Sequence, residues 1–183
     1  MKMTIKRLFD LTVAVLSLLL LFVPMILVMI ILKFTGEGEI FYLQKRLGYL
    51  NNEFKIIKFA TMVKNSPNIG TGSLTLRDDP RVLPFGKFLR KSKINELPQI
   101  FNVIIGNMSI VGPRPQMKVD FDKFPSKKRN EIYKSKPGIT GIGSIIFRDE
   151  DDLANRDKYL PIDTSYIQES DNVVDNYNNY NIL

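Results

Sequence analysis

Residues 11–32 read LTVAVLSLLLLFVPMILVMIIL, and none of these 22 positions carries a charged side chain. As an α-helix rising about 1.5 Å per residue, the run reaches roughly 33 Å, enough for the hydrocarbon core of a bilayer. It is too long for the apolar part of a cleaved signal peptide, and no small-x-small cleavage site follows it. We therefore predict that residues 1–34 are a membrane anchor.

The topology of this anchor follows from its charges and its proline. Basic residues flank the run on both sides: Lys2, Lys6 and Arg7 before it, and Lys33, Lys45 and Arg46 after it. The positive-inside rule therefore favours the cytoplasmic face for both ends. Pro24 bends a helix, and halves of about 20 Å and 13 Å are each too short to cross. We predict a re-entrant helix-break-helix with Pro24 as the membrane break; a kinked spanning helix is the alternative, since spans tolerate proline.

Composition limits the chemistry. The chain of 183 residues allows one modest domain besides the anchor, and it contains no Cys and no His. Disulfides, thiolate or imidazole catalysis and the usual zinc sites are therefore excluded. Residues 1–148 carry 24 Lys and Arg against 10 Asp and Glu, whereas residues 149–183 carry 2 against 9. A basic body suits the phosphate groups of a lipid, a nucleotide or a nucleic acid, although solvated lysines give the same count.

The rest of the chain predicts a small, mostly helical α+β domain at residues 35–148 and an acidic tail at residues 149–183. Residues 40–43 and 53–57 are typical of two strands joined by a turn at residues 48–52, which makes a short β-hairpin. Residues 64–80 are rich in Asn, Ser, Pro, Gly and Thr, so we expect a mobile loop. A last globular piece is expected at residues 125–148, and the end from about residue 170 is expected to be disordered.

An amphipathic helix is predicted after Arg81. Phe85, Phe88 and Leu89 recur at helical spacing, and basic side chains lie between and beside them. This pattern is typical of a helix at the membrane interface, and equally of a core helix with a basic outer face.

A second helix is predicted from Asn95 as N-cap, with Pro98 in its first turn and Gly106 as its stop. Asn95 and Glu96 would then lie at a helix start, where free amides favour a bound phosphate. Arg114 follows in a stiff turn, Gly-Pro-Arg-Pro, and arginine grips phosphate oxygens well. Taken singly, each of these features is also an ordinary structural device.

Several motifs occur together in one order along the chain: Lys6-Arg7-Leu8-Phe9-Asp10, Pro24, Gln44-Lys-Arg46-Leu-Gly48, Lys58-Phe59-Ala60-Thr61-Met62, Asp79-Pro80-Arg81, Gly86, Leu89-Arg90-Lys91, Glu96-Leu97-Pro98-Gln99, Asn102-Val103 and residues 108–115. In this combination, over roughly residues 3–145, the chain resembles the bacterial sugar transferases, the small monotopic phosphoglycosyl transferases. The resemblance implies a re-entrant anchor at the cytoplasmic face of the cell inner membrane. It also implies the first step of a surface glycan pathway: transfer of a phospho-sugar from a UDP-sugar to polyprenol phosphate, with release of UMP and a requirement for Mg²⁺.

The resemblance also assigns site residues. Arg90 and Arg114 correspond to the family's phosphate-binding arginines, and Lys58 is a further candidate for binding substrate phosphate. Glu96 is the candidate catalytic carboxylate and the best candidate Mg²⁺ ligand; Asp78 or Asp79 are candidates to assist it. A carboxylate can attack phosphorus while a metal and arginines neutralise the phosphoryl oxygens.

One departure from the family pattern concerns the nucleophile. Family members have Asp directly before the Glu, whereas this chain has Asn95, and a carboxamide cannot form the acyl phosphate. Lesser departures are Val23, Ala60 and Asn107, where Ser, Arg and Asp are usual. Three interpretations follow: Glu96 acts as nucleophile or as base for direct attack by the lipid phosphate; the chain is an inactive homologue that binds lipid or a partner; or Asn95 was introduced to trap a complex.

The expected partners are the UDP-sugar donor, the polyprenol phosphate acceptor and the membrane, with a second copy of the chain or downstream glycosyltransferases as further candidates. A different class of function is a basic adaptor at the membrane surface with no active site. Nucleic acid is not an expected partner, because the basic residues are interleaved with membrane-facing aromatics and no recognition motif occurs.

Overall fold

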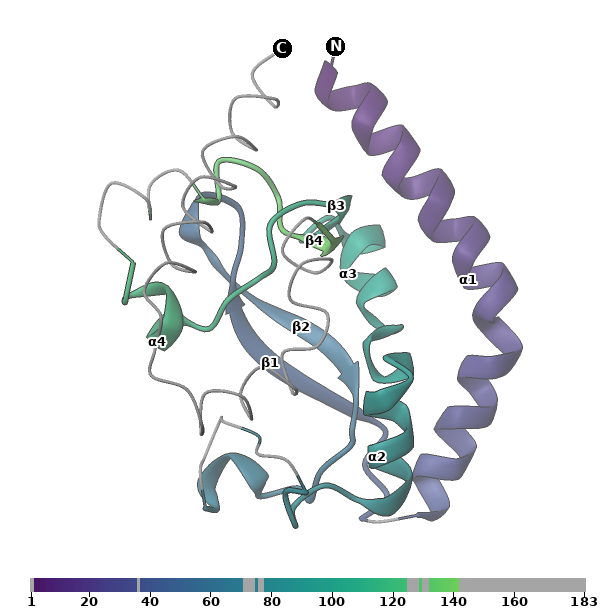
Figure 1. Ribbon diagram of the computed structural model, residues 1–183. Coiled ribbons are helices and arrows are strands. Elements are labelled where there is room, and N and C mark those ends of the chain that lie inside the picture. The colour runs from purple at the N-terminus through teal and green to yellow at the C-terminus, as the bar shows by residue number, and fades with distance from the viewer. Residues whose placement is uncertain are drawn as a thin grey trace. The chain divides into compact units, whose positions relative to one another are not determined.

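The computed structural model describes residues 2–35, 37–70, 75, 78–124, 129 and 132–141. Its helices and strands, in chain order, are α1 Lys2–Phe34, β1 Phe41–Leu47, β2 Glu53–Phe59, α2 Pro84–Lys91, α3 Gln99–Ile105, β3 Ser109–Val111, α4 Lys118–Phe121 and β4 Gly138–Thr140 (Figure 1). Short 3₁₀ turns lie at Tyr49–Asn51, Ser66–Asn68 and Ile94–Glu96. The predicted mixture of helix and sheet is confirmed, whereas the acidic tail and most of residues 125–148 lie outside the described residues.

The anchor is one long helix. Within α1, Ile5–Phe34 is apolar and long enough to cross a membrane by length and composition. The helix continues through Pro24, so the structure does not divide it into the two separate helices that we predicted. Figure 1 shows a helix that curves along its length, as expected when a proline removes one hydrogen bond and the turns on either side persist. The path of this helix through the membrane stays a prediction.

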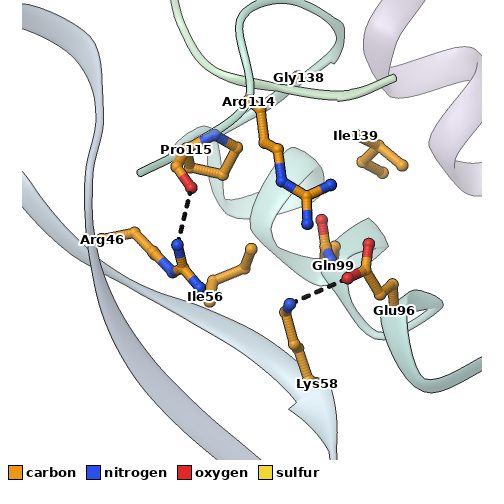
Figure 2. A pocket seen from close by; sticks show the side chains of 9 residues that line it. All are labelled: Arg46, Ile56, Lys58, Glu96, Gln99, Arg114, Pro115, Gly138 and Ile139. Carbon is orange, nitrogen blue, oxygen red and sulfur yellow. Dashed lines mark hydrogen bonds and ion pairs between the residues drawn. The ribbon is translucent and has the colours of Figure 1, made fainter. Parts of the chain in front are cut away.

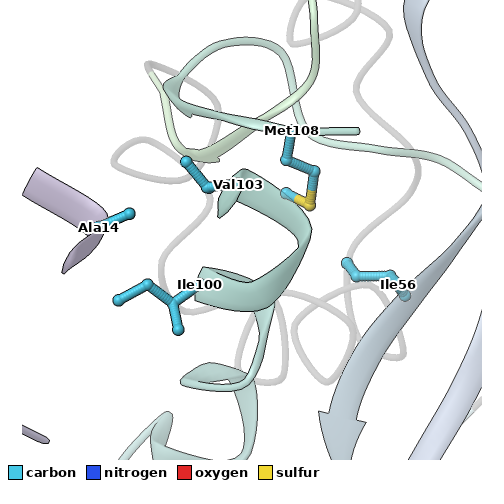
Figure 3. Close-up of a cluster of buried hydrophobic side chains, with 5 residues drawn as sticks. All are labelled: Ala14, Ile56, Ile100, Val103 and Met108. Carbon is cyan, nitrogen blue, oxygen red and sulfur yellow. The ribbon is translucent and has the colours of Figure 1, made fainter. Parts of the chain in front are cut away.

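One face of α1 packs against the rest of the described chain. Ala14 lies in a cluster with the buried side chains Ile56, Ile100, Val103 and Met108 (Figure 3). Nearer the end of α1, a second cluster combines Met25, Val28 and Leu32 with Phe59 and Leu89. Other apolar side chains of α1 are exposed, among them Leu16, Leu19, Leu20 and Phe22. The helix therefore presents one face to protein and leaves an apolar face for lipid.

Two polar residues fasten the beginning of α1. The buried Asp10 carboxylate accepts hydrogen bonds from the Ser109 hydroxyl, at 2.9 and 3.0 Å, and from the Ile110 amide, at 3.1 Å. Arg7 donates to the carbonyls of Val103 and Ile104, at 2.6 and 2.8 Å. These carbonyls lie in the last turn of α3, where they have no hydrogen-bond partner within the helix. The Lys6–Asp10 motif thus joins the anchor to residues about 100 positions away.

The predicted β-hairpin is confirmed. β1 and β2 pair antiparallel, from Phe41 opposite Phe59 to Leu47 opposite Glu53, so β1 is longer than the predicted residues 40–43 and includes Arg46. Asn102 attaches α3 to this hairpin: its side-chain oxygen accepts from the Ile57 amide at 2.9 Å, and its NH₂ group donates to the Lys55 carbonyl at 2.8 Å.

A second, parallel pair of strands was not predicted. β3 pairs with β4, and Gly112 and Gly138 allow the two chain segments to approach closely. A Cβ atom on Gly138 would lie 2.1 Å from the Gly112 nitrogen, which no other residue type tolerates. This contact places the turn at residues 112–115 beside residues 137–141.

Helix α2 confirms the helix predicted after Arg81, and its place at a membrane interface stays a prediction. Leu89 and Gly86 are buried against the core, whereas Phe88 is exposed. The prediction of a mobile loop at residues 64–80 is wrong for residues 66–69. There, the buried Arg81 donates to the carbonyls of Ser66 and Ile69 and holds the segment in place.

Candidate active site

One pocket brings together three of the predicted site residues, Lys58, Glu96 and Arg114 (Figure 2). It is lined by side chains from β1, β2, the 3₁₀ turn before α3, α3 itself, the turn after β3, and β4: Arg46, Ile56, Lys58, Glu96, Gln99, Arg114, Pro115, Gly138 and Ile139. The pairing of β1 with β2 places Arg46 and Lys58, and the pairing of β3 with β4 brings in Arg114. Figure 2 shows three basic side chains that approach this space from different elements.

Glu96 and Lys58 form an ion pair inside the pocket. Lys58 Nζ lies 2.9 Å from Glu96 Oε1, and the two side chains are only 25% and 16% exposed for Glu96 and Lys58. Burial by itself would raise the pKa of Glu96, but attraction to Lys58, their hydrogen bond, Arg114 and a hydrogen bond with Gln99 together lower it below the usual 4.5. Glu96 is therefore an ionised carboxylate at neutral pH.

The basic groups outnumber the carboxylate. Burial lowers the pKa of Lys58 below its usual 10.5, and repulsion from Arg46 and Arg114 adds to this although Glu96 opposes it. Burial and then repulsion from Arg114 also lower the pKa of Arg46. Three cations around one carboxylate are a formal excess of two positive charges. Such a pocket suits a dianionic ligand with several oxygen acceptors, as in a phosphate or diphosphate group.

The structure corrects the predicted role of Asn95. Helix α3 begins at Gln99, and Asn95 lies in the preceding 3₁₀ turn, where its side chain makes no capping hydrogen bond. The cause is Pro98, which has no N–H to bond to the Ile94 carbonyl, so the turns before α3 keep the tighter i to i+3 pattern. The Asn95 Oδ1 atom is buried without a hydrogen-bond partner among the described residues, and Asn95 is not among the pocket's lining residues.

Two further candidates lie elsewhere. Arg90 is in α2 and donates to the Thr75 hydroxyl at 3.0 Å; it is not among the lining residues. Both Asp79 carboxylate oxygens accept hydrogen bonds from the Arg81 guanidinium, at 2.9 and 2.6 Å. Asp79 is therefore the partner of a buried arginine and does not line the pocket; that it assists a metal stays a prediction. Asp78 is exposed and is not among the pocket's lining residues either.

The lining residues do not form a resident magnesium site. Mg²⁺ prefers several oxygen ligands, yet Glu96 is the one carboxylate among the residues that line this pocket, and it already binds Lys58. Within the described part of the chain, no group of three acidic side chains is placed to hold a metal ion. The surrounding cations repel a divalent ion unless an anion enters with it.

Sequence reasoning missed Arg46 and Gln99 as pocket residues. Both residues belong to the motifs quoted above. A sequence motif, however, does not show that a strand and a helix bring the two side chains together. The structure brings together Lys58, Glu96 and Arg114 as predicted, and adds Arg46 to them.

Comparison with known proteins identifies the family of the chain. Residues 1–177 match the family model described as bacterial sugar transferase. The exopolysaccharide production protein ExoY of Sinorhizobium fredii is 38% identical over 178 residues, covering 89% of this chain and 76% of that protein. The undecaprenyl-phosphate glucose phosphotransferase of Komagataeibacter xylinus is 35% identical, covering 89% of this chain and 32% of that protein. The UDP-glucose:undecaprenyl-phosphate glucose-1-phosphate transferase of Xanthomonas campestris pv. campestris is 37% identical, covering 89% and 34%. The chain is a member of the bacterial sugar transferase family.

Proposed function

We propose that this protein transfers a phospho-sugar from a UDP-sugar to polyprenol phosphate at the cytoplasmic face of the membrane. The observation that carries the proposal is the convergence of Arg46, Lys58 and Arg114 around one ionised carboxylate, Glu96. Relatives named as transferases from UDP-glucose to undecaprenyl phosphate support the substrate class. Both substrates are phosphates, and the pocket's excess of positive charge suits them.

Glu96 is proposed as the nucleophile. Its carboxylate oxygen attacks the sugar-bearing phosphorus of the donor, the bond from that phosphorus to the bridging oxygen breaks, and UMP leaves with the electron pair. The lipid phosphate oxygen then attacks the same phosphorus and displaces Glu96, which gives the lipid diphosphate sugar. The lowered pKa keeps the carboxylate ionised, as a nucleophile must be, and makes it a poor proton acceptor, which disfavours the role of a base.

Magnesium is proposed to enter as part of the substrate. The diphosphate of a nucleotide-sugar binds Mg²⁺ through its own oxygens. The pocket then does not need to supply a full set of ligands for the cation. Glu96, the carboxylate among the lining residues, would contact this complex while it pairs with Lys58. Arg90, on α2, is proposed to contact the donor beyond the pocket.

The anchor is proposed to enter and leave the membrane on one face. Support comes from both ends of α1: Arg7 and Asp10 bond to residues 103–110, while Leu32 packs in the cluster that contains Phe59. A helix that crossed the bilayer would put these two ends on opposite faces, which one folded unit cannot contact together. A curved helix whose ends return to one domain satisfies both sets of contacts.

The test of activity is UMP release from a panel of UDP-sugars with Mg²⁺ and polyprenol phosphate, in membranes that carry the wild-type chain, Asn95→Asp or Glu96→Gln. We expect release by the wild type and loss in Glu96→Gln. Donor label that remains on the protein in the absence of lipid, and disappears when lipid is added, identifies the covalent route. If neither the wild type nor Asn95→Asp releases UMP, the proposal of a transferase is wrong.

The test of topology uses the absence of cysteine from the chain. Single variants Lys6→Cys and Lys33→Cys, both at exposed positions, are labelled with a membrane-impermeant maleimide in vesicles of known orientation. A re-entrant anchor predicts that both label from the cytoplasmic face. Labelling of Lys6→Cys from the opposite face supports a spanning helix.

A further inference from the structure

The turn that carries Arg114 is fixed by hydrogen bonds from several distant segments. Four consecutive carbonyls accept from outside the turn: Pro113 from the Gly138 amide at 3.0 Å, Arg114 from the Tyr133 hydroxyl at 2.9 Å, Pro115 from Arg46 Nη1 at 3.3 Å, and Gln116 from the Leu47 amide at 2.9 Å. Pro113 and Pro115 also restrict the backbone on either side of Arg114. The guanidinium therefore projects from a backbone with little freedom to move.

Among these donors, Tyr133 makes a bond in each direction. Its hydroxyl donates to the Arg114 carbonyl and accepts from the Gln116 amide, at 2.9 and 2.8 Å. The side chain is 1% exposed, stacks on Phe121 with ring centroids 5.5 Å apart, and does not line the pocket. Burial raises the pKa of Tyr133 to about 12, so the hydroxyl keeps its proton.

We propose that Tyr133 is the positioning residue of Arg114, and that its hydroxyl aims the guanidinium at the phosphate group of the donor. This inference rests on the proposed function, because the aim of Arg114 has a consequence only if the pocket holds a phosphate. Misplacement of a substrate-binding group by about 1 Å lowers a rate by up to about 100-fold. A hydrogen bond to the Arg114 backbone outside the pocket can therefore affect the reaction inside it.

Tyr133→Phe removes the hydroxyl and retains the ring that stacks on Phe121. We expect kcat for UMP release to fall about tenfold with a smaller change in KM, since an arginine on the transferred phosphoryl group acts most strongly in the transition state. Tyr49→Phe is the matched control, because Tyr49 is 42% exposed and does not line the pocket. It is expected to retain the wild-type kcat.

A double-mutant cycle separates positioning from general loss of structure. If Tyr133 acts through Arg114, the double variant Tyr133→Phe, Arg114→Ala is no slower than Arg114→Ala alone. If the two losses multiply, Tyr133 has only a structural role and the inference is wrong. Urea midpoints of all variants show whether each is folded at the assay temperature.

Amide hydrogen exchange at Arg114 and Gln116, with and without inorganic pyrophosphate, tests the inference without turnover. We expect pyrophosphate to slow exchange there in the wild type and in Tyr49→Phe, and to have no such effect in Tyr133→Phe. Equal protection in Tyr133→Phe contradicts the positioning role alone. No protection in the wild type contradicts phosphate binding by this pocket, whereas protection without UMP release leaves the positioning role intact and removes the proposed reaction.

Discussion

Among the described residues, the ion pairs Asp79–Arg81 and Lys58–Glu96 are both largely shielded from solvent, but their surroundings differ. Around Asp79 and Arg81, each guanidinium nitrogen of the arginine has a protein acceptor: the two carboxylate oxygens and the carbonyls of Ser66 and Ile69. Around Glu96 and Lys58, two more cations, Arg46 and Arg114, line the same pocket. The first pair balances its charge internally, whereas the second leaves an excess of positive charge.

This difference separates a structural ion pair from a functional one. Both pairs occur in motifs on which the resemblance to the sugar transferases rests. Burial does not distinguish them, because both are largely shielded from solvent. What distinguishes them is the charge balance of the surrounding groups. A balanced pair fixes a chain segment, here residues 66–69, and an unbalanced one attracts an anion.

The largest effect is expected for Arg114→Ala. Removal of one preorganised donor from a charged transition state slows an enzyme by about 100-fold or more, so UMP release should fall by that factor. The matched control is Lys118→Ala on α4, where an exposed lysine pairs with Asp122 outside the pocket. An equal loss in both variants would show that total positive charge matters and the pocket does not.

Asp79→Asn tests the other side of the comparison. The change leaves the buried Arg81 without an ionised partner, so the urea midpoint should fall markedly. The rate per folded molecule should stay at the wild-type value, because Asp79 does not line the pocket. A lower rate at unchanged stability would contradict the structural role given to this pair.

Lys58→Arg is expected to move the alkaline limb of the pH–rate profile. The lowered pKa of Lys58 means that it loses its proton at a lower pH than the usual 10.5, and the pocket then loses one cation as pH rises. Arginine stays protonated over this range, so the limb should move to higher pH. On the acid side, the lowered pKa of Glu96 keeps it ionised to below pH 4.5, and Lys58→Arg should leave that limb unchanged because arginine keeps the positive charge beside Glu96. An unchanged alkaline limb in Lys58→Arg would assign it to another group.

The smallest effect is expected for Lys45→Ala. Lys45 lies 3.6 Å from Glu53 on the hairpin, and the two side chains are 75% and 51% exposed. Exposed pairs contribute about 0.5 kcal/mol to the free energy of unfolding or less, because water and salt screen them. Urea denaturation of Lys45→Ala and the wild type measures this small loss of stability. The loss measured for Asp79→Asn should be clearly larger.

Sequence patterns predicted what depends on local chemistry. The anchor, the hairpin, the helix after Arg81 and the stop at Gly106, whose φ is 103°, follow from apolar runs, turn residues and the conformational freedom of glycine. Asn95 looked like a helix cap because its side chain suits that position. The missing N–H of Pro98 instead delays α3 to Gln99, and this competition is hard to weigh from sequence alone.

What the patterns did not predict depends on distant contacts. The pairing of β3 with β4 joins segments about 30 residues apart through glycines that show no strand periodicity. The entry of Arg46 into the pocket follows from the length of β1, and the hold of Tyr133 on Arg114 follows from side-chain packing. Lys58, Glu96 and Arg114 were predicted from motifs, but their charge balance became visible only with the structure.

The bonds at the beginning of α1 also order events during synthesis. Arg7 and Asp10 are made about 100 residues before their partners, Val103 to Ile110. Until then, a buried carboxylate and a guanidinium beside an apolar helix have no acceptor or donor from the domain and stay in water at the membrane surface. The anchor therefore completes its polar contacts with the domain only after α3 and β3 have been made.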